Sequence, residues 1–127
     1  MRAKALLYRL GAETEKGAAL RALLREAAIL TLTAEAEQLG ETAGRLAATN
    51  AAPTAMPPPE TAPACEFLLL CGLGDWQLDR LLAAMRRAGV SVPYKAVLTE
   101  HNKSWPLAKL IEEVAREHET MAAARER

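Results

Sequence analysis

A proline-rich segment near the middle of the chain divides the sequence into two parts. Residues 49–64 contain five of the seven prolines and almost no large apolar residue. Proline fixes φ and has no N–H to donate, so this segment can form neither a helix nor an inner strand. We therefore predict a linker at 49–65 between an N-terminal half, 1–48, and a C-terminal half, 66–119, with a frayed tail at 120–127.

The first half alternates apolar runs with helical spacing. Residues 4–10 predict a strand that ends at Gly11, and the apolar run at 28–32 predicts a second strand. Between them, apolar residues recur at i, i+3, i+4 and i+7, which is typical of one buried helical stripe. These residues are Leu20, Leu23, Leu24 and Ala27. A short helix is expected after an acidic turn at 33–40. It would bury Leu39, Ala43, Leu46 and Ala47.

The second half begins with the same two elements. Residues 66–71 are a continuous apolar run, typical of a strand that is covered on both faces. The next segment has Asp75 near its front, Arg86 and Arg87 near its back and Gly89 as a stop. Acid at the start, bases at the end and a terminal glycine together predict a helix.

A strand and a helix complete the second half. Residues 90–98 predict the strand, and Pro93 belongs at its first residues or on a sheet edge. The helix is expected to begin around Ser104 and Trp105, with Ser104 as N-cap and Pro106 in the first turn. It would bury Leu107, Leu110, Ile111, Val114 and His118.

Both halves therefore have the order strand, helix, strand, helix. We predict an α/β fold of two βαβα pseudo-repeats, although their sequence identity is low. Each half alone supplies only two strands, which are too few to be stable in water. The halves are thus expected to merge into one four-stranded sheet with flanking helices and the linker outside. Two independent domains are the alternative.

Composition narrows the classes of function and the compartment. Sixteen basic residues offset sixteen acidic ones, and neither half is polarised, which argues against a nucleic-acid partner. The longest apolar run near the start is 5–8, too short for a signal peptide or a membrane span, so a cytoplasmic protein is expected. Cys65 and Cys71 are six residues apart on one predicted strand. An extended strand would place them about 20 Å apart, beyond the ~7 Å between Cα atoms that a disulfide allows, so no disulfide is expected between them.

The candidate site lies where strands of a parallel pair end. Ligands collect beyond the carboxyl ends of such strands, and both loops there lead into helix N-termini, which favour anions. The tentative ligand-binding residues are Gly72, Gly74, Trp76, Lys95, Thr99, Asn102, Lys103 and Trp105. A purely structural interpretation stays open, in which the glycines make a tight turn, the polar residues cap a helix and the tryptophans close the core.

A catalytic interpretation is weaker. Cys71 and His101 could form a thiol–base pair on the same sheet edge, with Lys103 nearby, but no third residue is evident. Gly72 and Gly74 imitate the start of a dinucleotide fingerprint whose third glycine is replaced by Gln77. The two histidines have no metal-ligand spacing. We therefore assign no catalytic residue, no metal and no cofactor.

The second half also resembles a known family. The pattern Leu78-Asp79-x-Leu81-Leu82 is followed by Gly89-Val90-x-Val92-Pro93-x-Lys95-Ala96-Val97-Leu98-Thr99-x-x-Asn102-x-x-Trp105. Over residues 66–118 this is similar to a small bacterial family known only as a domain of unknown function. The resemblance implies no known activity, substrate or cofactor. It places emphasis on Lys95, Thr99, Asn102 and Trp105, and not on His101.

These observations favour a non-catalytic binding or regulatory module that recognises a small anionic ligand or a protein partner. The alternative is a small enzyme that uses Cys71, His101 and Lys103 at the strand ends. A third possibility is a purely structural or a dimerising protein. Neither a nucleic acid nor a membrane is expected as a partner.

Overall fold

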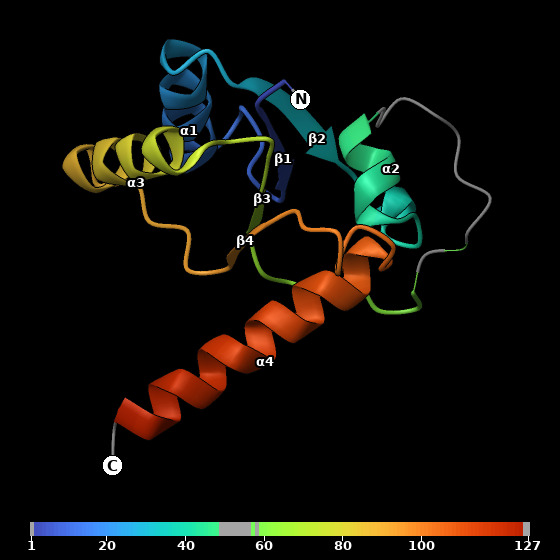
Figure 1. Ribbon diagram of the computed structural model, residues 1–127. Coiled ribbons are helices and arrows are strands. Elements are labelled where there is room, and N and C mark those ends of the chain that lie inside the picture. Colours follow the sequence, from blue (N-terminus) through green and yellow to red (C-terminus); the bar gives the residue numbers. More distant parts are fainter. Residues whose placement is uncertain (1, 49–56, 58, 126–127) are drawn as a thin grey trace.

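The computed structural model describes residues 2–48, 57 and 59–125 of the 127-residue chain (Figure 1). Its elements, in chain order, are β1 (Lys4–Tyr8), α1 (Glu15–Glu26), β2 (Leu30–Ala34), the 3-10 turn η1 (Ala36–Gln38), α2 (Ala43–Ala48), β3 (Phe67–Cys71), α3 (Asp75–Ala88), β4 (Lys95–Val97) and α4 (Leu107–Arg125). Each half of the chain thus has the predicted order of strands and helices.

The four strands form one mixed sheet in the order β2-β1-β3-β4. Within each half the two strands are parallel, β1 with β2 and β3 with β4. The halves meet through β1 and β3, which are antiparallel with Leu6 opposite Leu69. The predicted α/β fold with one shared sheet is confirmed. That the halves are repeats of one another stays a prediction.

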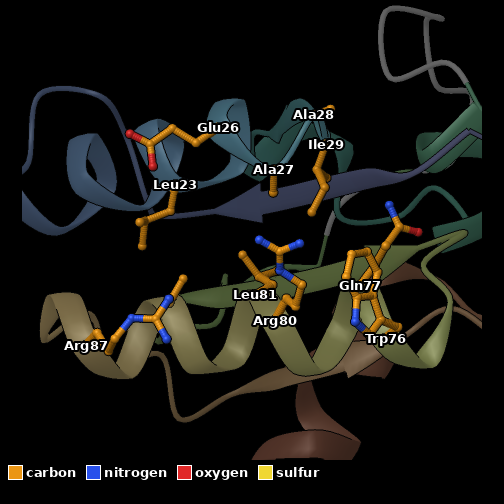
Figure 2. Close-up of a pocket in the computed structure, with 11 residues that line it drawn as sticks. Leu23, Glu26, Ala27, Ala28, Ile29, Trp76, Gln77, Arg80, Leu81 and Arg87 are labelled. Carbon is orange, nitrogen blue, oxygen red and sulfur yellow. The ribbon is translucent and has the colours of Figure 1, made fainter.

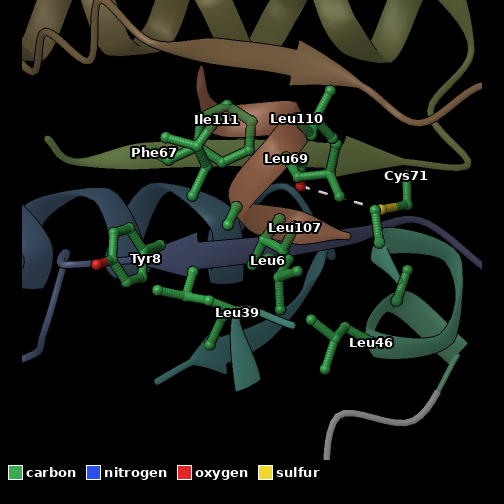
Figure 3. Packing of buried hydrophobic residues seen from close by; sticks show 14 residues of the cluster. Leu6, Tyr8, Leu39, Leu46, Phe67, Leu69, Cys71, Leu107, Leu110 and Ile111 are labelled. Carbon is green, nitrogen blue, oxygen red and sulfur yellow. Dashed lines mark hydrogen bonds between the residues drawn. The ribbon is translucent and has the colours of Figure 1, made fainter. Parts of the chain in front are cut away.

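Alternation along the central strands gives the sheet two apolar faces. Ala5, Leu7, Leu68 and Leu70 point toward α1 and α3, where Leu20, Leu24, Leu81 and Met85 cover them. Leu6, Tyr8, Phe67, Leu69 and Cys71 point to the other face, against α2 and α4 (Figure 3). Period-two alternation explains why adjacent residues of one strand belong to different clusters. We call these the α1/α3 face and the α2/α4 face.

Two elements differ from their predicted extents. The strand expected at 90–98 is reduced to the three residues of β4, because Pro93 cannot donate to a ladder while Val90 and Val92 bury in the α1/α3 face. The last helix begins at Leu107 rather than near Ser104, and it continues to Arg125 through an alanine-rich stretch. Alanine has the highest helix propensity, which favours this extension into the tail that was expected to fray.

Only the end of the predicted linker lies within the described residues. Residues 49–56 and 58 are outside them. Near its end, the carbonyl of Pro63 accepts hydrogen bonds from the hydroxyl of Tyr8 at 2.7 Å and from Nε of Arg9 at 2.9 Å. The linker therefore rejoins the fold at the carboxyl end of β1. Both cysteines are free thiols, as the sequence predicts. No helix among the described residues is long and apolar enough to cross a membrane.

Candidate functional site

The turn after β4 is built by Thr99 and Asn102. The Asn102 side chain accepts from the Thr99 N–H at 2.9 Å and donates to the Val97 carbonyl at 3.1 Å. In return, the Thr99 hydroxyl accepts from the Asn102 N–H at 3.2 Å. Short polar side chains often close turns in this way. These two predicted site residues are thus engaged in shaping the backbone.

The same turn joins the N-terminal ends of α2 and α4. The N–H groups of Ala43 and Gly44 donate to the carbonyls of Trp105 and Lys103, at 2.9 and 2.8 Å. The N–H groups of Leu107 and Ala108 donate to carbonyls of the loop before α2, Glu41 at 2.9 Å and Leu39 at 3.0 Å. The first N–H groups of a helix have no partner inside it. Here each helix is capped by the backbone that leads into the other.

This reciprocal capping bears on the anion site expected ahead of α4. Anions bind at a helix N-terminus through free N–H groups, and the N–H groups of Leu107 and Ala108 already have carbonyl partners. Gly44 allows the close approach, since a Cβ there would lie 2.9 Å from the carbonyl oxygen of Lys103. Thr99, Asn102, Lys103 and Trp105 are therefore brought together by a structural junction.

The remaining polar side chains of this region point to solvent or to near neighbours. Nζ of Lys103 pairs with Glu100 at 2.6 Å, and Nζ of Lys95 donates to the carbonyl of Val92 at 3.1 Å. The His101 ring lies edge-on to Trp105, with centroids 5.1 Å apart. Lys95 lies away from the turn, on the α1/α3 face of the sheet. It is paired in register with Leu68 of β3, whose side chain packs on that face. These groups do not converge on a common cavity.

The Cys71–His101 pair proposed for catalysis does not present a reactive thiol. Cys71 is 1% exposed and packs within the α2/α4 face (Figure 3). Burial raises the pKa of its thiol to about 11, against a smaller lowering effect of the positive charge on Lys4. Burial likewise raises the pKa of Cys65. At neutral pH both residues stay protonated, whereas a cysteine nucleophile acts as thiolate.

Trp76 lies on the opposite side of the sheet from Trp105. Gly72, with φ of 72°, and Gly74, the N-cap of α3, carry the chain from β3 into the first turn of α3 on the α1/α3 face. Trp76 in that turn is 69% exposed. Trp105 instead packs against the α2/α4 cluster. The two tryptophans therefore form no shared stacking wall.

Trp76 borders a groove between α1 and α3 with a volume of about 330 Å³ (Figure 2). The guanidinium of Arg80, one turn along α3, lies 4.7 Å from the centre of the Trp76 ring. Leu23, Ala27 and Ile29 supply an apolar wall on the α1 side. Among the lining residues, Arg80 and Arg87 from α3 carry positive charge, and Glu26 from α1 carries negative charge.

Sequence reasoning missed most of this groove. Trp76 and Arg80 are four residues apart in a predicted helix, and side chains at this spacing meet on one helix face. This spacing was a signal in the sequence for the contact between them. No pattern in the sequence places α1 beside α3, so the α1 residues could not be assigned. Within the described residues, no group of three or more His, Cys, Asp or Glu side chains could hold a metal ion.

Comparison with known proteins is informative only for the second half. No curated protein and no solved structure matches the chain. Trp76, Arg80 and the turn from Thr99 to Trp105 all lie in the part that does match a family model. Residues 66–121 match the family described as a domain of unknown function (DUF3783), which confirms the predicted resemblance of this half to a family of that kind.

Proposed function

We infer that the protein is a non-catalytic binding module whose α1–α3 groove receives a segment of a partner protein. The observation that carries this proposal is the exposure of Trp76, 69%, beside a groove and under the guanidinium of Arg80. Tryptophan and arginine are the residue types that contribute most often to interface hot spots. A stacked cation also holds the ring in place, so less side-chain freedom is lost on binding.

The lining of the groove indicates the chemistry of the partner segment. Leu23, Ala27 and Ile29 favour an apolar anchor side chain, while Arg80 and Arg87 favour a carboxylate next to it. The structure describes no ion pair for either arginine, so both charges are available. We expect a segment in which an aromatic or aliphatic residue adjoins Asp or Glu.

The groups of the alternative enzyme support a non-catalytic role instead. Burial raises the pKa of the Cys71 thiol to about 11, Lys103 is paired with Glu100, and the His101 ring lies edge-on to Trp105. A nucleophile, its base and an orienting residue need mutual hydrogen-bond contact. In the part of the chain that the structure describes, these three side chains have other partners.

Selection from random peptides displayed on phage tests the proposal. The wild-type protein should enrich peptides that combine an apolar anchor with an adjacent carboxylate, and calorimetry should then give their affinities. Trp76→Ala should weaken the enriched peptides by at least about 30-fold, the effect of removing a hot-spot residue. Met121→Ala, a change at an exposed apolar residue on α4, is the matched control and should bind as wild type.

Two outcomes would overturn the proposal. One is equal binding of the selected peptides to Trp76→Ala and to the wild type. The other is a thermal-shift screen in which small organic acids or nucleotides stabilise the wild type but not Trp76→Ala, while no peptide binds; the groove would then be a small-ligand site.

A further inference from the structure

The two outer strands of the sheet differ in how well their edges are protected. β4 has only three residues, includes the charged Lys95 and follows Pro93. Short length, lysine and proline are the features that keep an edge strand from pairing with another chain. β2 has five residues, Leu-Thr-Leu-Thr-Ala, with neither a charge nor a proline. Of the two edges, β2 is the one open to a further strand.

The backbone of β2 presents hydrogen-bonding groups on its outer side. β2 pairs with β1 on its inner side and is the last strand of the sheet. The N–H of Leu30 donates to the carbonyl of Ala3 at 3.0 Å, so Leu30 faces β1. Successive residues alternate in direction, which turns the N–H and C=O of Thr31 away from β1.

Positive charge gathers beside this edge. An open groove of about 580 Å³ between α1 and β2 is lined by three arginines, Arg2, Arg21 and Arg25, and by no carboxylate. Arg21 is held by the carbonyl of Leu10 at 3.1 Å and the hydroxyl of Thr33 at 3.0 Å. Arg2 and Arg25 are exposed, and neither guanidinium has a hydrogen-bond or ion-pair partner among the described residues. The net charge of the whole chain is zero, so this concentration is local.

We propose that the β2 edge binds an extended, acidic segment of a partner protein, which adds a fifth strand to the sheet. Main-chain hydrogen bonds to Thr31 supply affinity, and carboxylates of the added strand face Arg2 and Arg25. A second copy of this chain fits less well, because pairing of two β2 strands would bring the same arginines of both α1 helices together. The site uses neither Trp76 nor Arg80, so it stands independently of the α1–α3 groove.

The test uses a fluorescein-labelled peptide of alternating Glu and Val residues as the probe, read by fluorescence anisotropy with the full chain. The same peptide with Lys in place of Glu is its matched control. We expect the acidic peptide to bind at low salt, to weaken by at least about tenfold when salt is raised, and to bind at least about tenfold better than the lysine peptide.

Two variants locate the binding. Arg25→Glu should weaken the acidic peptide by at least about fivefold. Thr31→Pro removes the outward N–H at an edge position, where proline is tolerated, and should abolish binding, whereas Thr31→Val should retain it. Should the proline variant fail to fold by circular dichroism, a probe N-methylated at both its Glu and its Val residues replaces it, so that the inward N–H groups are removed whichever way the added strand runs, and loss of binding is again expected. Trp76→Ala should bind the probe as wild type does.

Three results would overturn the proposal. Equal binding of the acidic and lysine peptides would remove the charge argument. Unchanged binding to folded Thr31→Pro, or of the N-methylated probe, would show that the strand edge is not used. Tighter binding of a poly-dT oligonucleotide that competes with the acidic peptide would reassign the arginines to nucleic acid. None of these results concerns Trp76, so the proposed function of the groove would be unaffected.

Discussion

The two faces of the sheet hold their helices in different ways. On the α2/α4 face, the helix N-termini are joined by four backbone hydrogen bonds, and the turn from Thr99 to Trp105 serves that junction. On the α1/α3 face, the helices leave a groove between them, with the exposed ring of Trp76 beside it. The polar residues of one face are thus needed for folding. On the α1/α3 face, the exposed ring of Trp76 takes part in no such junction within the part of the chain that the structure describes.

The largest effect that separates the faces is expected from Cys71 at high pH. The pKa of its thiol is about 11 in the folded protein against 9.0 for an unperturbed thiol. Between these values only the unfolded chain ionises, so the free energy of unfolding falls as pH rises through this range. The total loss is about 2–3 kcal/mol, and there is none below pH 9. Urea denaturation should show this decline in wild type but not in Cys71→Ala; equal declines would contradict the burial of the thiol.

A smaller loss is expected when a methyl group enters the α2–α4 junction. In Gly44→Ala the new Cβ meets the carbonyl of Lys103 at 2.9 Å. The hydrogen bond there must lengthen, and we expect a loss of about 1–3 kcal/mol by urea denaturation. Gly74→Ala is the matched control on the α1/α3 face, where a Cβ meets nothing within 4 Å, and should cost less than about 1 kcal/mol. Equal costs would mean that the junction does not constrain Gly44.

Substitutions at Asn102 and at its neighbour Lys103 compare the stability contributed by the turn with that contributed by a surface ion pair. Asn102→Ala removes two side-chain hydrogen bonds to backbone groups, at Thr99 and Val97, and should cost about 1–2 kcal/mol. Lys103→Ala removes only an exposed pair with Glu100 and should stay within about 0.5 kcal/mol of wild type. Thermal unfolding monitored by circular dichroism would rank the two. A larger cost for Lys103 would indicate that its ion pair holds the turn.

The smallest effect on stability is expected at Trp76. Its ring is mostly exposed, so Trp76→Ala should change the free energy of unfolding by no more than about 0.5–1 kcal/mol. Leu81→Ala, one turn further along the same helix at 2% exposure, should cost about 2–5 kcal/mol. Urea denaturation of the pair provides the check. A large loss at Trp76 would place its ring in the core and remove it as a binding residue.

Local chemistry in the sequence predicted most of the fold. The apolar run at β3 and the charges and terminal glycine of α3 predict elements that the structure contains. Each half supplies only two strands, and a two-stranded sheet is not stable by itself in water. This alone predicts that the halves share one sheet. The antiparallel contact of β1 with β3 could not be predicted, because it depends on how two separate halves dock. Pro93 indicated an edge strand. The short length of β4 could not be predicted, because it also depends on the burial of Val90 and Val92 in the α1/α3 face.

The candidate site was harder to predict for the same reason. Asn102 and Thr99 can cap a turn or bind a ligand with the same atoms, and only their hydrogen-bond partners decide between the two. Trp76 was identified as a candidate. Its companions from α1 were not, since contact between α1 and α3 is a tertiary feature. The arginines beside β2 are spread from residue 2 to residue 25 and gather only in space.

The reciprocal capping of α2 and α4 also sets the size of the cooperative folding unit. The family match begins at residue 66, yet two N–H groups of α4 depend on carbonyls of Leu39 and Glu41, which lie before it. A fragment of residues 66–121 would lose these partners and the β1 edge of its sheet together. The amide hydrogens of Ala43, Gly44, Leu107 and Ala108 should therefore exchange with solvent in one concerted opening, although they belong to opposite halves of the chain.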